Sequence, residues 1–251
     1  MTPNQIIGKT REELNAMAER CRDMAEDLEE LADGLPVIPM EAGPSSDPVQ
    51  GFEAVSRMLH TGQRPDLGQI IHTTLTDNRV AKWRVIDTDS MARLPGSIRP
   101  VVAQLLEIME YRPFSLPNKE HPWGWNNYEA SELADWLDET LAKDLLQADD
   151  FGCLVGRKDL GEKRRYMWLL SAEEAGFGEL EKAFDWYACG DEDERQERRQ
   201  LKDSDGDPAY WWLRTPNSGH ANVVRVVYTD GSLDSSDAGV ANGVAPACII
   251  G

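Results

Sequence analysis

Apolar residues recur every three or four positions near the start of the chain, which places them on one face of an α-helix. The seam consists of Leu14, Met17, Cys21, Met24, Leu28, Leu31 and Leu35. Thr10 and Glu13 form a capping box that begins the helix, and Gly34 and Pro36 end it. The seam predicts either a short coiled coil that joins protomers into a homo-oligomer, or an amphipathic helix packed on the chain's own globular domain.

The residues after this helix are typical of a linker. Residues 36–51 are rich in Pro, Gly and Ser, which favour turns and extended chain. We therefore expect an N-terminal helix and linker in residues 1–49. Residues 50–251 are then expected to form one domain, because this length can bury a full core.

Within residues 50–251 the hydrophobic pattern alternates between the helical and the strand period. Helices are expected at residues 52–60, 98–111 and 131–146. Strands are expected at residues 67–71, 82–87, 153–156, 166–170 and 223–227. Residues 183–200 carry dense mixed charge and are expected to form a solvated surface. The mixture of elements predicts an α+β fold class.

The C-terminal stretch has apolar ends and a polar middle. It opens on Trp211-Trp212-Leu213 and closes on the apolar tail 244–250, so both ends are expected to be buried. Arg214 then needs a buried structural partner, because an unpaired guanidinium beside the core is costly. Turn signals at 217–219 and 230–231 break the middle, where 223–227 is the one plausible strand.

The residues from Thr215 onward use a restricted alphabet. They include no Lys, Glu, Gln, Met, Phe or Trp, although the rest of the chain contains all of these. Ser, Gly, Asn, Asp, Tyr and His, which are present, are also favoured in antibody paratopes, since they combine hydrogen bonding with amphipathic contact area. Ordinary polar surface loops use many of the same residues, and that interpretation stays open.

Composition narrows the classes of partner. The formal net charge of −19 argues against nucleic acid, because a phosphate backbone is bound by clustered Lys and Arg. The chain contains no apolar run long enough for membrane insertion. Residues 1–5 lead into a polar helix rather than an apolar stretch, so we expect a chain made without a signal peptide. A virion or a cell surface is the expected location, with the cytoplasm as an open alternative.

Few residues form patterns that suggest catalysis or metal binding. Asp203, Asp205 and Asp207 have the spacing of a calcium loop, but Arg214 occupies the position where the bidentate Glu is required, so these are weak metal candidates. The four histidines and four cysteines show neither zinc-ligand spacing nor a nucleophile motif. We therefore predict no catalytic residue and no cofactor.

Aromatic residues cluster just before the helix expected at 131–146. Trp123, Trp125 and Tyr128 form this patch, for which core and loop packing is the favoured interpretation and a sugar platform the alternative.

Four motifs, in order along residues 70–251, resemble those of C-type-lectin-like domains. They are Lys82-Trp83-Arg84-Val85-Ile86-Asp87, the spacing Ser131-x-Leu133-x-x-Trp136-Leu137, Met167-Trp168-Leu169-Leu170-Ser171-x-Glu173-Glu174, and Trp211-Trp212-Leu213-Arg214 followed by a Gly-Val-x-Pro-Ala ending. The last motif and the restricted alphabet also resemble the variable proteins of diversity-generating retroelements. In those proteins, mutagenesis at template adenines generates a similar set of residues.

The resemblance implies a C-type-lectin-like fold that carries a variable segment at about 211–247. The protein would then be a non-enzymatic binder of a protein or glycan target on a cell surface. The ligand-binding residues would be Asn217, Ser218, His220, Asn222, Arg225, Tyr228, Asp234, Ser235, Ser236 and Asp237. Alternatives are an assembly protein that oligomerises through Leu14–Leu35, and an oxidase like the formylglycine-generating enzymes, for which Cys189 and Cys248 would be the pair to consider.

Overall fold

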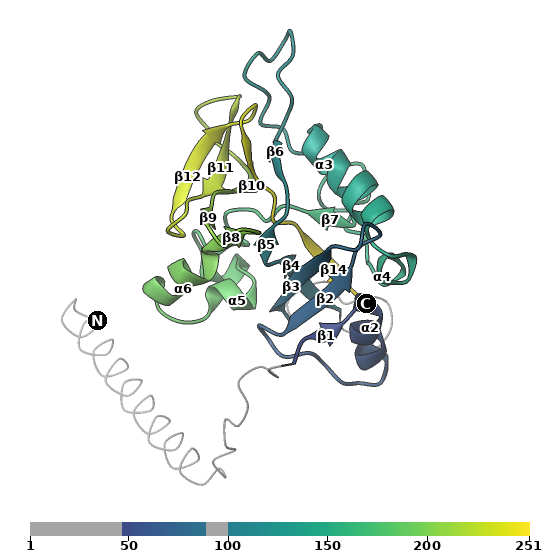
Figure 1. Cartoon of the computed structure of the whole chain (residues 1–251). Coiled ribbons are helices and arrows are strands. Elements are labelled where there is room, and N and C mark those ends of the chain that lie inside the picture. Colours follow the sequence, from purple (N-terminus) through teal and green to yellow (C-terminus); the bar gives the residue numbers. More distant parts are fainter. Residues whose placement is uncertain (1–46, 89–99) are drawn as a thin grey trace, which may run out of the picture. The chain divides into compact units, whose positions relative to one another are not determined.

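The computed structural model describes residues 47–88 and 100–251, which fold into three sheets with helices around them (Figure 1). The described residues belong to one compact unit, Pro44–Gly251. The fold class is α+β, as predicted. The seam Leu14–Leu35 and the capping box at Thr10 lie outside the described residues. No helix of the described part combines the length and the apolarity needed to cross a membrane.

The largest sheet has six strands in the order β1-β2-β3-β4-β14-β7. Its strands are β1 (Val49–Gln50), β2 (Ile70–Thr74), β3 (Val80–Asp87), β4 (Val101–Leu105), β7 (Met167–Trp168) and β14 (Ala247–Ile250). The C-terminal strand β14 pairs antiparallel with β4 on one side and with β7 on the other. Every residue of β14 is buried, as its apolar sequence predicts.

A second sheet has the order β12-β11-β10-β13-β6. Its strands are β6 (Tyr111–Pro113), β10 (Trp211–Pro216), β11 (Val223–Val227), β12 (Leu233–Asp237) and β13 (Ala241–Gly243). A small third sheet joins β5 (Glu107–Ile108), β8 (Leu201–Asp203) and β9 (Pro208–Ala209). Trp211, Trp212 and Leu213 are fully buried, which confirms their assignment to the core.

The helices lie around the sheets and are mostly short (Figure 1). They are α2 (Phe52–His60), α3 (Glu132–Trp136), a π-helix (Leu137–Leu145), α4 (Ala148–Gly152), a 3-10 turn (Leu180–Lys182), α5 (Asp185–Ala188) and α6 (Glu192–Arg199). The helix predicted at 52–60 is confirmed, and the helix predicted at 131–146 is present as α3 with its π-helical continuation. Ser131 caps α3, since its hydroxyl oxygen accepts the backbone N–H of Ala134 at 3.1 Å.

The helix predicted at residues 98–111 is wrong. This segment, as far as the structure describes it, contains β4 and β5 and leads into β6. Every residue of β4 is buried, because β3 and β14 flank it and both of its faces are covered. A strand buried on both faces shows no alternation of apolar and polar residues, so its pattern is indistinguishable from that of a buried helix.

Three smaller expectations are also corrected. Residues 223–227 are not the one strand between the apolar ends, because the mostly polar segment Leu233–Asp237 forms β12, which pairs with β11 along its whole length. Of the expected strands 153–156 and 166–170, only Leu154, in a single bridge to Ile250, and Met167–Trp168 have strand pairing.

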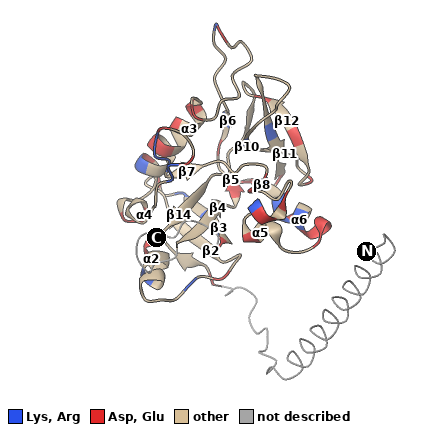
Figure 2. Ribbon diagram, turned by 180° about the vertical axis from the view of Figure 1, so that it is seen from behind, with Lys and Arg blue, Asp and Glu red and all other residues tan. Residues whose placement is uncertain are grey.

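In the charged segment 183–200, residues 189–194 are exposed, and acidic and basic residues lie side by side on α6 (Figure 2). Ala183, Phe184, Tyr187 and Arg199 are buried and so depart from the predicted solvated surface, and Arg199 is the charged one among them, at 1% exposed. Its guanidinium lies 4.2 Å from the ring centre of Phe177 and donates to Glu192 at 2.7 Å. One turn of this charged helix therefore anchors α6 to the core.

Candidate functional site

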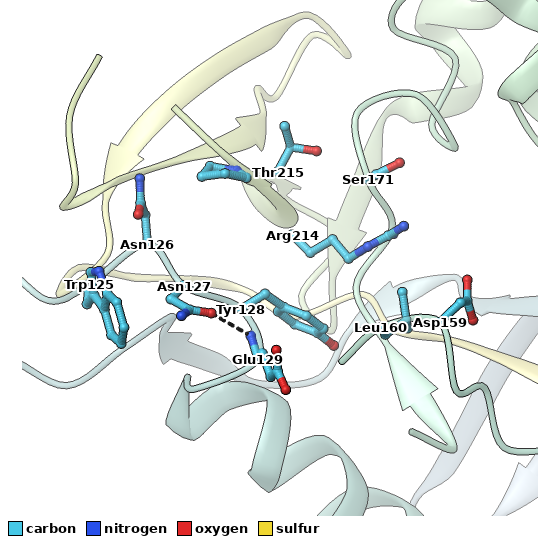
Figure 3. A pocket seen from close by; sticks show the side chains of 11 residues that line it. Trp125, Asn126, Asn127, Tyr128, Glu129, Asp159, Leu160, Ser171, Arg214 and Thr215 are labelled. Carbon is cyan, nitrogen blue, oxygen red and sulfur yellow. Dashed lines mark hydrogen bonds between the residues drawn. The ribbon is translucent and has the colours of Figure 1, made fainter. Parts of the chain in front are cut away.

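An open pocket of about 610 Å³ lies where the end of β10 meets two loops (Figure 3). Figure 3 shows Trp125 and Asn126 at one end of this pocket and Leu160 and Asp159 at the other. The lining residues are Trp125, Asn126, Asn127, Tyr128, Glu129, Asp159, Leu160, Ser171, Arg214, Thr215 and Pro216. The lining combines aromatic rings with amides, hydroxyls and charges, as ligand pockets do.

One wall of the pocket is held by a buried ion-pair network centred on Glu174. Its carboxylate accepts hydrogen bonds from both terminal nitrogens of Arg214, one of them at 2.9 Å, and from Arg157 at 3.0 Å. It also accepts the backbone N–H of Ser171 at 3.0 Å. The prediction of a buried partner for Arg214 is therefore confirmed, and that partner is Glu174.

The network fixes the charge state of its carboxylates. Burial alone would raise the pKa of Glu174, but the hydrogen bonds and charges of Arg214 and Arg157 outweigh it and hold this pKa below its ordinary value. The hydrogen bond from Arg157 likewise lowers the pKa of Asp159. Burial raises the pKa of the Tyr128 hydroxyl, which accepts the backbone N–H of Leu169 at 3.1 Å. These shifts favour charged Glu174 and Asp159 beside the two arginines and a neutral Tyr128 hydroxyl.

Asn126 joins the pocket to the turn that carries the first predicted ligand residues. Its side-chain amide donates to the backbone carbonyls of Asn217 at 3.3 Å, His220 at 2.8 Å and Val223 at 3.1 Å. Its own backbone N–H donates to the carbonyl of Ala221 at 2.9 Å. The turn 217–222 is thus fastened to the pocket rim through main-chain atoms.

The predicted ligand residues lie on this turn and on the hairpin β11–β12, and none of them is fully buried. Two of their side-chain clusters are hydrogen-bonded. The Ser235 hydroxyl accepts from Asn217 at 3.3 Å and from Arg225 at 2.9 Å, and Asp237 accepts from Asn222 at 2.8 Å.

The structure does not place all ten residues on one face. Arg225 pairs with Ser235, whereas Asp234 and Ser236 alternate with Ser235 and point to the other face of the sheet. Tyr228 is half-buried and packs edge-on against Tyr210, with 4.5 Å between the ring centres. Ser218, His220 and Asp234 are the most exposed, so these three side chains are freest to meet a partner.

The aromatic patch before α3 divides into three environments. Tyr128 is buried, as the packing interpretation predicts, whereas Trp123 is 67% exposed and contradicts it. Trp125 is half-buried and stacks flat on His121, with 5.0 Å between the ring centres. The polar pocket residues Asn126, Asn127, Glu129 and Ser171 are not predicted as site residues from the sequence. The adjacent aromatic patch points to the loop of the first three, whereas Ser171 follows β7.

The described residues do not support a metal or redox centre at the positions considered. No group of three or more His, Cys, Asp or Glu among them could hold a metal ion. Asp203 instead closes its own turn, accepting the backbone N–H groups of Asp205 and Asp207 at 3.0 Å each. Cys189 is an exposed free thiol and Cys248 a fully buried one whose pKa is raised by burial.

A protein-family model described as a domain of unknown function, DUF6273, matches residues 106–251. The match includes every residue that lines the pocket and every predicted ligand residue. No curated protein and no solved structure matches the chain.

Proposed function

The chain belongs to the DUF6273 family of domains of unknown function, and we propose that it is a non-enzymatic binder of a protein or glycan target on a cell surface. In this proposal its fold is C-type-lectin-like and its C-terminal segment is of the kind found in variable proteins of diversity-generating retroelements. The proposed binding surface consists of the turn 217–222, the exposed residues at the edge of the hairpin β11–β12, Asp234 among them, and the adjoining pocket.

The placement of the four motifs supports the proposed fold. Lys82–Asp87 lies in β3, Ser131–Leu137 begins α3, Met167–Trp168 forms β7 and Trp211–Arg214 begins β10. All four contribute fully buried residues to one core. Their packing into one core supports the proposal that the four motifs belong to one framework.

The observation that carries the proposal is the attachment of the turn through its backbone. Asn126 binds carbonyl oxygens of Asn217, His220 and Val223, and every amino acid supplies such an oxygen. Replacement of the side chains in the turn therefore leaves this attachment in place. A binding loop whose side chains vary on a fixed scaffold needs this arrangement.

Recognition in this proposal combines two kinds of contact. Ser218, His220 and Asp234 supply exposed hydrogen-bonding groups, and the half-buried Tyr228 supplies contact area that is already ordered by Tyr210. The pocket beside them accepts a protruding group of the target, with Trp125 as an apolar surface. Rigid aromatic anchors next to adaptable polar groups are typical of binding hot spots.

Replacing Ser218, His220 and Asp234 together by Ala is expected to weaken target binding by at least about tenfold, which corresponds to about 1.4 kcal/mol. Binding would be measured on arrays of glycans and cell-surface proteins, with the affinity for each hit determined in solution. The melting temperature should stay unchanged, because all three side chains are exposed.

The matched control replaces Ser204, His60 and Asp193 by Ala, since these are the same residue types, exposed and outside the proposed surface. The control should bind like the parent protein. Equal binding by both triple variants, or loss of the folded state in the Ser218, His220 and Asp234 variant, would contradict the proposed surface.

The narrower retroelement assignment makes a prediction about the encoding DNA. We expect a reverse transcriptase gene nearby, together with a near-repeat of the codons for residues 211–247 that differs mainly at adenines. Sequencing the locus tests this directly. A locus without both features would rule out diversification and leave a lectin-like binder of fixed sequence.

A further inference from the structure

Two arginines flank the ring of Trp186, on the side of the molecule formed by β3, α5 and α6. The guanidinium carbon of Arg84 lies 4.6 Å from the ring centre, and that of Arg198 lies 4.9 Å from it. Each distance is within the range of a cation–π contact. The three residues thus form one stack, which we call the Trp186 stack.

Neither arginine of the Trp186 stack has an acidic partner among the described residues, where no carboxylate lies within 4 Å of either guanidinium. Elsewhere in the fold, Arg157, Arg165 and Arg214 each hold at least one carboxylate within that distance. The contrast is notable because the chain has 45 acidic and 26 basic residues, so a carboxylate partner would be easy to supply. Two neighbouring cations without an anion in the described part of the chain favour a negatively charged ligand at this position.

The Trp186 stack also contains hydrogen-bond donors without acceptors. Nε of Arg84 and Nε1 of Trp186 are both buried, and neither has a partner within the part of the chain that the structure describes. A buried donor left unpaired costs about 1–3 kcal/mol. Burial and, to a smaller extent, the charge of Arg198 lower the pKa of Arg84, whereas Tyr187 acts in the opposite direction. An anion at the accessible edge of the guanidinium groups would compensate their charge and strengthen the polar surroundings of these donors.

Several contacts hold the Trp186 stack in place. Arg198 donates from one terminal nitrogen to the backbone carbonyls of Trp186 at 3.0 Å and Cys189 at 2.9 Å, which ties α6 to α5. Tyr187 donates its hydroxyl to Gln104 at 2.5 Å, which ties α5 to the sheet. Trp186 also presses on Gly68, where a Cβ would lie 2.7 Å from the ring. The donors are therefore pre-arranged and do not need ordering when an anion binds.

We propose that the Trp186 stack is a binding site for a tetrahedral oxyanion of the phosphate or sulfate type, separate from the target-binding surface proposed above. Guanidinium groups recognise such oxyanions through paired, charge-assisted hydrogen bonds. The terminal nitrogens of the half-buried Arg84 and Arg198 bind the oxygens of the anion, and the Trp186 ring holds the two guanidinium groups beside each other. The anion is free or is a group on a larger ligand.

The test follows the indole N–H signal of Trp186 by nuclear magnetic resonance while inorganic phosphate is added at constant ionic strength. The signal is assigned by its loss in Trp186→Phe. We expect it to move saturably, with a dissociation constant on the order of 1 mM, as suits a single small anion. Arg84→Gln and Arg198→Gln should each weaken the binding by about tenfold or more.

Arg57→Gln is the matched control, because it removes the same charge from an exposed arginine that already has a carboxylate partner, Glu53. It should leave the phosphate titration unchanged. A parallel titration with sulfate distinguishes a site for tetrahedral oxyanions in general, in which both ions saturate the signal, from one that selects phosphate. A linear, unsaturable response up to about 50 mM phosphate, or saturation that persists unchanged in both arginine variants, would overturn the proposal.

Discussion

Replacing Glu174 by Gln is expected to lower the free energy of unfolding by about 3–5 kcal/mol, the usual cost of removing one partner from a buried ion pair. The carboxylate of Glu174 is the shared acceptor for Arg157 and Arg214, and its side chain is 9% exposed. Without it, Arg214 loses the only carboxylate within 4 Å among the described residues, and Arg157 keeps only the exposed Asp159. Urea unfolding at neutral pH would measure the loss.

The neighbouring Glu173 is the control for this variant. Its side chain is 56% exposed, and its one ion pair among the described residues is with Lys182, so Glu173→Gln should change stability by no more than about 0.5 kcal/mol. A similar effect from both substitutions would show that the buried network is not the cause.

The dependence on pH gives a second check of the same variant. Because the pKa of Glu174 is lower in the folded protein than its ordinary value of 4.5, its contribution is present above that value and is lost as pH falls through the lowered pKa. The difference in stability between the parent protein and Glu174→Gln should therefore shrink in acid. A difference that stayed constant with pH would contradict the ionised network.

Replacing Trp212 by Ala is expected to cost about 3–5 kcal/mol, the range for large-to-small substitutions of buried aromatic residues. Trp212 is fully buried, and its ring meets that of Phe114 edge-on, with 5.6 Å between the centres. Its indole N–H donates to the carbonyl of Arg112 at 2.8 Å, which joins β10 to β6. Ala would lose these contacts, leave a cavity and leave the carbonyl of Arg112 without its donor. Urea unfolding monitored by circular dichroism measures the change.

Trp123→Ala is the control for the Trp212 substitution, because it removes the same side chain from a site that is 67% exposed. We expect its stability to stay within about 0.5 kcal/mol of the parent protein. Comparable losses at the two positions would mean that burial does not determine the cost.

The sequence predicted those parts of the fold in which one periodicity dominates. The helix at 52–60 and the strand at 223–227 have clear patterns and are found where expected. The strand β4 was mistaken for a helix because covering both of its faces removes the alternation that marks a strand. The strand β12 was missed because four of its five residues are Asp and Ser, which have low strand propensity, and cross-strand pairing with β11 supplies the missing stabilisation.

The candidate site was harder to predict because it is assembled from distant segments. The pocket joins residues 125–129, 159–160, 171 and 214–216, and no local spacing connects them. The partner of Arg214 could be anticipated from the cost of a buried charge, but its identity as Glu174, forty residues earlier, depends on the fold. The amide of Asn126 is similar, since asparagine in a loop is common and only the folded chain brings it against the turn 217–222.

The position of β14 between β4 and β7 has a consequence for the kinetics of folding. Ala247 pairs with Gln104 in β4, so the sheet can close only after a loop of roughly 140 residues has been brought together. Until then, β4 and β7 each have an unpaired edge, and apolar surface on both is accessible to other chains. Contacts so distant in sequence are associated with slow folding. The interval before β14 docks is therefore when aggregation competes with folding, and dilution or a chaperone would raise the yield of folded protein.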